Sequence, residues 1–351
     1  MSLWADVRSL FTFRDSPARL GIAIQAALAI GIPTIGFALA GRADLGLLTS
    51  TGTFTALYLS GRSRHERATL LPLIALGLVV SSTIGALTAA LPVISLIALF
   101  FVASAACVLT LGFSVGPPGA LFFVLVCGVS GHLVAPVAAG GAALPAPLVV
   151  GLLALGCAIA YLVVLTPLIN PSHRTRDASI HRERQKVTFT LDGVSRIILT
   201  RQILALAIAT ALSAPLGTPR AYWVVMTVVA VLQNGHRIRM SVLRGAHRVL
   251  GTLVGVAVFA LVVTLNPTGI WVAILVTVLQ FLIELVVIRN YGLALVLITP
   301  LALTIAAQAH SGPAVDIIRD RVADTVLGAV VAIGVLFLAH GWDSVSKRRV
   351  A

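Results

Sequence analysis

The stretch APLVVGLLALGCAIAYLVVLT, residues 146–166, carries no charged side chain over 21 consecutive positions. A helix of that length is about 30 Å long, which matches the hydrocarbon core of a bilayer. The chain turns polar directly afterwards, with NPSHRTRD at residues 170–177. The contrast predicts a membrane-spanning helix that leaves the lipid near residue 168.

The composition of the whole chain extends this interpretation. Of its 351 residues, 58% are hydrophobic and only 11% are charged, whereas soluble domains carry about 25% charged residues. A soluble fold of this size could not bury so much apolar surface. The sequence therefore predicts an all-α integral membrane protein. The net charge of +13 is explained by basic cytoplasmic loops, which makes nucleic acid an unsuitable partner.

Hydrophobic runs of about the length of a membrane span recur along the chain. The second, seventh and eighth of these runs are short. Three interpretations fit a short span: it is tilted, it is re-entrant, or neighbouring helices shield it from lipid. The twelve predicted spans are 19–40, 44–60, 69–90, 93–112, 117–135, 146–166, 201–215, 221–234, 249–265, 269–288, 291–309 and 322–341.

The arginines and lysines give the orientation of these spans. With a cytoplasmic amino terminus, 21 of the 25 basic residues fall on the cytoplasmic side. Basic residues collect in cytoplasmic loops, so this asymmetry predicts that both termini are cytoplasmic. The four on the outer side are Arg42, Arg220, Arg319 and Arg321, of which the last two lie near aspartates in sequence that could neutralise them.

The long polar stretch divides the chain into two halves. We predict a first six-helix repeat at 1–168, a basic cytoplasmic linker at 169–200 and a second six-helix repeat at 201–351. Basic loops follow the second span of each half, and Arg62 and Arg237 occupy matching places in them. Six spans return the chain to the same side, so the repeats should be parallel, with a transport path at their interface.

Glu284 is the acidic residue that lies well inside a predicted span. An ionised carboxylate in lipid is costly unless it is paired, protonated or hydrated. One interpretation is a proton-coupling carboxylate. The other is an ion pair with Arg289 or with an arginine of the ninth span, and the sequence favours neither strongly.

The densest short basic segment lies between the eighth and ninth spans. In a helix, Arg237, Arg244 and Arg248 would share one side, with Arg239 between them. Arginine forks bind carboxylates with two hydrogen bonds, so this segment could collect organic anions. The alternative is a segment that sets topology and contacts lipid headgroups.

Small residues and a proline shape the spans that follow. Gly251, Thr252 and Gly255 have the spacing that allows close helix packing. Thr299 and Pro300 should kink the eleventh span and free a backbone carbonyl that could line a cavity.

One segment imitates a catalytic motif. GVSG at residues 128–131 has the form of the intramembrane serine protease motif, and His340 could be suggested as its base. The predicted topology places Ser130 near the outer face and His340 near the inner face, so they could not share a proton. Nucleotide-binding and metal-ligand motifs are also missing, and the sequence predicts neither an enzyme nor a cofactor.

The second half resembles the fusaric acid resistance and aromatic acid exporter family. The motifs that carry the resemblance occur in order over residues 222–330. They are Tyr222-Trp223, Arg244-x3-Arg248-x2-Gly251-Thr252-x2-Gly255, Arg289-Asn-Tyr291-Gly, Thr299-Pro300-Leu301 and Arg321-x2-Asp324-Thr325-x2-Gly328.

The resemblance implies a bacterial inner-membrane exporter of aromatic or other organic acids that is driven by protons. It places Arg244, Arg248, Tyr291, Thr299 and Pro300 among the family's motif residues, and the anion pathway is predicted from these together with Arg237 and Arg239. A second group is assigned to structure, comprising Gly251, Thr252, Gly255, Arg289, Asp324 and Gly328.

Two other functions stay open at this point. Plant malate channels are similar to this family, which raises a passive anion channel, and a scaffold for envelope enzymes would need no transport. The partners predicted are an organic anion, protons and lipid, while a homo-oligomer or an envelope partner stays undetermined.

Overall fold

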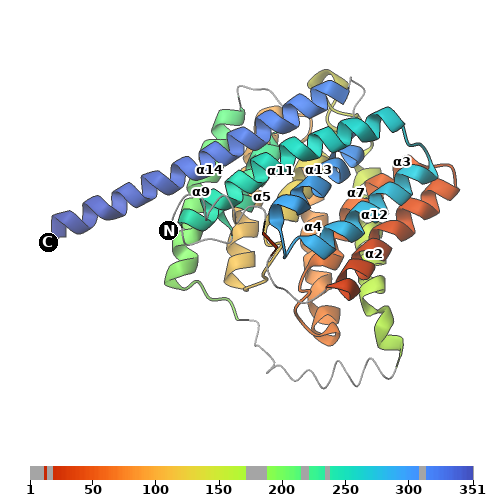
Figure 1. Cartoon of the computed structure of the whole chain (residues 1–351), viewed down its shortest axis with the longest axis horizontal. Helices are drawn as coiled ribbons and strands as arrows, with labels where there is room; N and C mark the ends of the chain where they lie inside the picture. Colours follow the sequence, from red (N-terminus) through yellow and green to blue (C-terminus); the bar gives the residue numbers. More distant parts are fainter. Residues whose placement is uncertain are drawn as a thin grey trace.

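The computed structural model describes residues 12–13, 19–170, 188–214, 221–233, 238–307 and 314–350, with backbone alone for 314 and 340–350. Twelve α-helices and three short 3-10 helices, and no strand, occur in these ranges. The α-helices form an elongated bundle beyond which the end of α14 projects (Figure 1). The all-α fold is therefore confirmed. The α-helices are α2 Leu20–Leu39, α3 Ala43–Thr53, α4 Arg64–Thr88, α5 Pro92–Gly112, α6 Leu121–Val134, α7 Ala146–Leu165, α9 Gly193–Ser213, α10 Tyr222–Leu232, α11 Ile238–Leu265, α12 Ile270–Val286, α13 Tyr291–Ala307 and α14 Ala314–Val350.

Each predicted span overlaps one of these helices. In the described part of the chain, seven helical segments are long and apolar enough to cross a membrane, while α6, α10, α12 and α13 are shorter. The helices α9, α11 and α14 begin 8 to 11 residues before the predicted spans. Hydropathy marks the part of a helix that lies in lipid, whereas the backbone hydrogen bonds continue into polar residues outside it.

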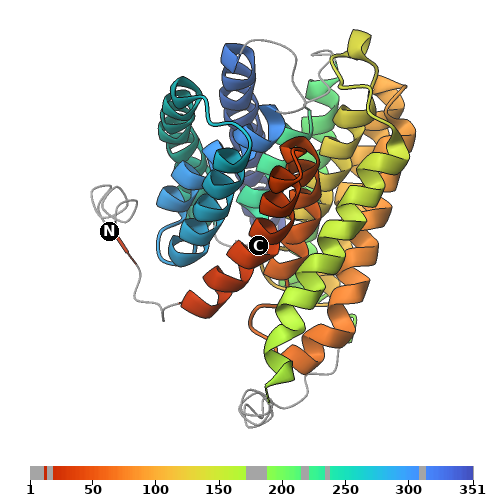
Figure 2. The ribbon, with the colours of Figure 1, turned by 90° about the vertical axis from the view of Figure 1, so that its right-hand side faces the viewer.

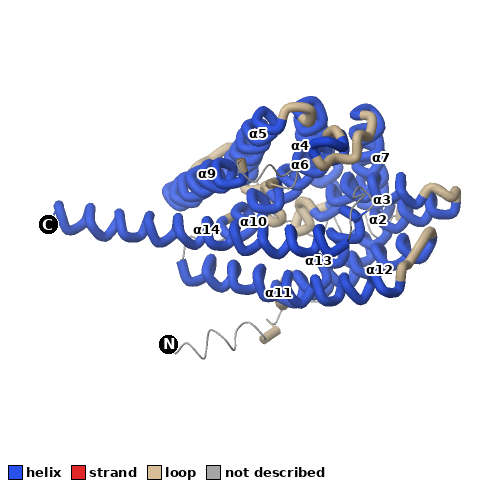
Figure 3. The backbone as a smooth tube through the Cα atoms, turned by 90° about the horizontal axis from the view of Figure 1, so that it is seen from above, coloured by secondary structure: helices blue, strands red, loops and turns tan. Residues whose placement is uncertain are grey.

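The helices of the two halves pack in matching pairs. In the first half α4 packs against α6 and α7, and in the second half α11 packs against α13 and α14. Likewise, α3 packs on α7 and α10 on α14. Between the halves, α2 packs on α12 and α9 packs on α5. The helices of the two halves can be followed from above in Figure 3.

Glycines allow the closest of these contacts. A Cβ added to Gly156 of α7 would meet the carbonyl oxygen of Thr49 on α3. A Cβ added to Gly328 of α14 would come within 2.7 Å of the carbonyl oxygen of Val224 on α10. Backbones can approach this closely only where no side chain intervenes.

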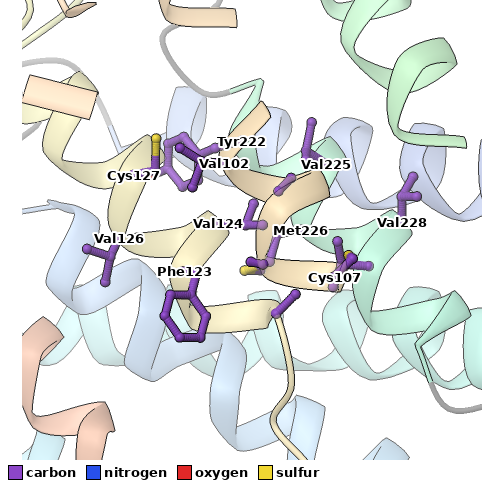
Figure 4. Packing of buried hydrophobic residues seen from close by; sticks show 14 of the residues in the cluster. Val102, Cys107, Phe123, Val124, Val126, Cys127, Tyr222, Val225, Met226 and Val228 are labelled. Atoms are coloured by element: carbon purple, nitrogen blue, oxygen red, sulfur yellow. The ribbon is translucent and has the colours of Figure 1, made fainter. Parts of the chain in front are cut away.

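The centre of the bundle is built around α10. Every residue of this helix is buried, as expected for a segment that is hydrophobic on all sides. Figure 4 shows its side chains meeting those of α5 and α6, with Val225 and Met226 among the labelled residues. The helix predicted to be short is therefore shielded by its neighbours, one of the three interpretations of short spans.

A capping box fixes the beginning of α4. The Ser63 hydroxyl accepts a hydrogen bond from the Glu66 amide, and the Glu66 carboxylate accepts one from the Ser63 amide. Both bonds satisfy amides that have no partner within the helix.

Replacing Ser63 with alanine should destabilise the protein by about 1 kcal/mol, because the Glu66 amide loses its acceptor. The thermal midpoint of purified protein in detergent measures the effect. Thr69→Ala is the control, since the exposed Thr69 hydroxyl bonds only to a carbonyl of its own helix. An equal loss in both variants would contradict the assignment of the cap.

Candidate functional site

A cavity of about 680 Å³ lies among helices of both halves. Its walls come from α3 and α6 of the first half and from α10 to α14 of the second. In Figure 2 the teal to light-blue helices α11 to α13 stand beside the red to yellow helices of the first half. A volume of this size accommodates a small organic molecule.

The cavity is lined at one end by residues from the loops. Arg19 precedes α2, Ser60 follows α3, Pro117 lies between α5 and α6, Gln233 follows α10 and Asn290 lies between α12 and α13. The predicted topology assigns all five positions to the same side of the membrane. The structure brings these loops together around the cavity, and we call this end the mouth.

Arg248 is the most firmly held cation of the cavity wall. Its side chain is 3% exposed. Its Nε donates to the Thr227 hydroxyl at 3.2 Å, and its Nη1 donates to the Tyr291 hydroxyl at 3.1 Å. The guanidinium of Arg244 lies over the Tyr291 ring, 4.8 Å from its centroid. Neutral hydroxyl partners fix the guanidinium of Arg248 and leave its positive charge uncompensated, which suits an anion site.

The opposite wall of the cavity is apolar. It includes Leu48, Phe54, Phe122, Leu125 and Val129. The rings of Phe54 and Phe122 stack with their centroids 4.4 Å apart. A molecule with a charged group and an apolar body would find both of its parts matched here.

Glu284 lines the cavity near the mouth and is 7% exposed. Among the described residues, the cation it meets is Arg19, with 3.6 Å between Arg19 Nη1 and Glu284 Oε2. Arg19 Nη2 also donates to the Ser60 hydroxyl at 2.6 Å, and Gln280 Nε2 donates to Glu284 Oε1 at 3.5 Å. The partner thus comes from the beginning of α2 rather than from Arg289 or the ninth span.

Only part of the predicted anion pathway lines this cavity. Arg244, Arg248 and Tyr291 do, as does Arg289, which the resemblance had assigned to structure. Arg239 is exposed and does not line it. Arg237 lies outside the described residues.

Thr299 and Pro300 lie between helices instead. Both are buried in α13, and a Cβ on Gly255 of α11 would meet Thr299 and the Val296 carbonyl. That carbonyl, the one freed by the proline, therefore faces Gly255. Gly251 packs against Leu295 in the same contact.

The remaining residues assigned to structure are also buried. Thr252 follows Gly251 on α11 and is buried with it. On α14, Asp324 is 6% exposed and Gly328 packs on α10. None of these three lines the cavity.

The sequence did not predict three residues of the site. They are Arg19, Arg321 and Trp223, whose ring contacts the guanidinium of Arg321. Arg321 was placed in an outer loop because the predicted span began at residue 322. The helix in fact begins at Ala314. The apolar residues Val315, Ile317 and Ile318 were the available signal that the helix starts before Arg321.

The serine of the catalytic look-alike has another role. The hydroxyl of Ser130 is buried and forms a hydrogen bond of 2.7 Å with the Ser82 hydroxyl. This bond joins α6 to α4. The side chain of His340 lies outside the described residues.

Part of the second half is similar to a family of known proteins. Residues 204–335 match the model of the family described as fusaric acid resistance protein-like. An uncharacterized membrane protein of Bacillus subtilis strain 168, YvaC, is 29% identical over 136 residues, which is 38% of this chain and 21% of that protein. An uncharacterized Escherichia coli K12 protein, YhfK, is 29% identical over 153 residues, or 43% of this chain and 21% of the relative. The chain thus matches about a fifth of the length of these relatives.

No solved structure matches this chain. The resemblance predicted over residues 222–330 falls within the segment that the family model matches, and it is confirmed. The apolar helices and the similarity to a Bacillus membrane protein both indicate that this chain lies in a membrane. This chain is therefore a multi-pass membrane protein whose residues 204–335 match the model of the family described as fusaric acid resistance protein-like.

Proposed function

We propose that this protein is a secondary transporter that exports organic acid anions from the cytoplasm. The observation that carries the proposal is the cavity itself, which combines a wall of arginines with an apolar, aromatic wall. An aromatic acid has one carboxylate and one apolar ring, so both of its parts would be matched.

The mouth supports the proposed direction. The loops that surround it are those to which the positive-inside rule assigns the cytoplasmic side, and both termini would lie on that side of an inner membrane. The other end of the bundle holds the loops after α2, α4, α6 and α11. None of the described residues in these loops lines the cavity. At that end the lining residues, such as Leu133 of α6 and Ala306 of α13, lie within helices. Loops surround the cavity at the mouth alone among the described residues, and this asymmetry favours alternating access over the passive channel, which requires a continuous pore.

We also propose that the halves are parallel repeats. Support comes from two glycine contacts at matching places in the chain. Gly156 of α7 contacts α3 at Thr49 and Gly52, whereas Gly328 of α14 contacts α10 at Val224 and Thr227. The spacing between the contacted residues is three in both cases, as expected for related helix pairs.

In this proposal Glu284 couples transport to protons. It contacts Arg19 of the first half from α12 of the second, so its charge acts between the halves at the mouth. Protonation of a carboxylate removes its attraction for an arginine. Protonation of Glu284 would therefore weaken its contact with Arg19, and loss of the proton would restore it. In this proposal that change opens and closes the mouth.

The proposal is tested with purified protein in liposomes and radiolabelled aromatic acids, with and without a pH gradient. We expect accumulation against the concentration gradient of the acid and its loss when the pH gradient collapses. Equilibration without accumulation would support a channel. No flux of any acid tested would exclude aromatic acid export and favour the scaffold.

Arg248→Gln should weaken binding of the transported anion by about tenfold or more, because a charged hydrogen-bond donor is lost from a buried wall. The affinity is measured by calorimetry in detergent. Arg239→Gln is the matched control, since Arg239 is exposed on the same helix. Equal affinity in the two variants would leave Arg248 with a packing role alone.

A further inference from the structure

Arg321 is the most deeply buried arginine of the cavity wall. Its side chain is 1% exposed and lines the cavity. Its Nε, Nη1 and Nη2 are all buried without a hydrogen-bond partner among the described residues. Its guanidinium carbon lies 3.8 Å from the centroid of the Trp223 ring.

Stacking on Trp223 leaves the donors of Arg321 unused. A cation–π contact engages the flat face of the guanidinium, while its N–H bonds point outward in the plane of the group. A buried charge without hydrogen-bonded partners is strongly unfavourable. The arrangement therefore suits an anion that enters the cavity and accepts these bonds.

The neighbouring arginine of α14 shows the ordinary alternative. Arg319 is 75% exposed and lies 3.9 Å from Asp316 and 3.7 Å from Asp320. The sequence predicted that nearby aspartates neutralise both Arg319 and Arg321. Among the described residues, however, no aspartate forms a hydrogen bond with the guanidinium nitrogens of Arg321.

The two buried arginines contact residues of α10 that are one helical turn apart. Arg321 contacts Trp223, and Arg248 contacts Thr227. Trp223 and Thr227 are four residues apart on α10, which places them on one face about 6 Å apart. Two like charges on neighbouring positions of one buried helix face repel each other in a low-dielectric site, and one carboxylate between them would relieve the repulsion.

This pair of arginines lies deep in the cavity. Gln233, at the C-terminal end of α10, is a mouth residue, whereas Trp223 is the second residue of that helix. The distance along α10 between them is about 15 Å. Phe122 lines the same cavity from the apolar wall.

We propose that Arg321 and Arg248, positioned by Trp223 and Thr227, form the carboxylate-binding site at the deep end of this cavity. The ligand class is a monocarboxylate with an apolar ring. This choice of ligand rests on the proposed transport function, whereas the pairing of the arginines rests on their contacts alone.

Calorimetry with the full chain in detergent tests the site, with benzoate as the probe and uncharged benzamide as its matched analogue. We expect benzoate to bind, and Arg321→Gln to weaken that binding by about tenfold or more. Arg319→Gln, an exposed change on the same helix, should leave the affinity unchanged. Benzamide should bind weakly and equally to all three proteins.

The thermal midpoint without ligand separates binding from packing. Because Arg321 has no hydrogen-bond partner among the described residues, Arg321→Gln should not lower the midpoint, while the stabilisation caused by benzoate should disappear. Trp223→Phe, which keeps a ring with a weaker cation–π contact, should lower the benzoate affinity by a smaller factor.

Several results would overturn the site. They are no binding of benzoate by the unchanged protein, equal affinities in Arg321→Gln and Arg319→Gln, or loss of folding in Arg321→Gln. Since no gradient is imposed, the measurement is independent of transport. Benzoate binding that depends on Arg321 would stand even if liposomes show no accumulation, and accumulation without this dependence would refute the site alone.

Discussion

Glu284→Gln is expected to abolish accumulation of the acid driven by a pH gradient. Glutamine keeps the shape of the side chain and its hydrogen bonding to Gln280, but it cannot gain or lose a proton. Exchange of internal for external substrate needs no net proton movement, so it should continue. Both activities are measured in the same liposomes.

A double variant separates proton coupling from simple charge pairing. If Glu284 only neutralises Arg19, removal of both charges in Arg19→Gln/Glu284→Gln should restore accumulation. If Glu284 carries the proton, the double variant should remain defective. Folding should survive in each case, because the single variant keeps the partly exposed Arg19 and its bond to Ser60, and the double variant leaves neither charge without its partner.

Alanine at Gly156 or Gly328 is expected to destabilise the bundle by about 3 kcal/mol, the upper part of the range for overpacking. The new methyl group would meet a backbone carbonyl of α3 or α10. Neither carbonyl can move without displacing its helix, and α10 is buried on every side. The thermal midpoint and the yield of monodisperse protein measure the effect.

Both helices offer a matched control. Gly151 lies on α7 and Gly334 on α14, and a Cβ on either would have no neighbour within 4 Å. Alanine there should be neutral or slightly stabilising, since glycine is the weaker helix former. Similar losses at Gly156 and Gly328, with none at the controls, would support the proposed repeat. Tolerance of alanine at either buried glycine would refute the close packing of that pair.

The sequence by itself determined the class of protein and the approximate positions of the helices that the structure describes. Lipid contact requires long uninterrupted apolar runs, and these are local properties that hydropathy reports directly. Thus every predicted span overlaps a helix. The ordered motifs over residues 222–330 were sufficient to show the resemblance to the fusaric acid resistance family, and the family model matches residues 204–335. The ends of helices were less predictable, because a helix such as α14 continues past the lipid into polar residues.

The cavity depended on the tertiary structure. Arg244, Arg248 and Tyr291 could be selected from the sequence because they lie in a basic, motif-rich segment. Thr299 was selected because of the kink expected at Pro300 and the family resemblance, yet in α13 it lies against Gly255. Which face of a helix meets a cavity depends on its neighbours, and in a mainly apolar helix the sequence pattern does not mark that face.

The partners of the buried charges, which the sequence did not predict, come from segments far away in the chain. Glu284 meets Arg19, from the opposite half of the chain, and Arg321 meets Trp223 instead of a nearby aspartate. Hydropathy and charge counts describe each segment separately, so they cannot reveal which buried charges meet. The energy of a buried charge depends on its surroundings in space. The sequence therefore determined that these charges lie in or beside a membrane, and only the packing of α2 on α12 and of α14 on α10 decided their partners.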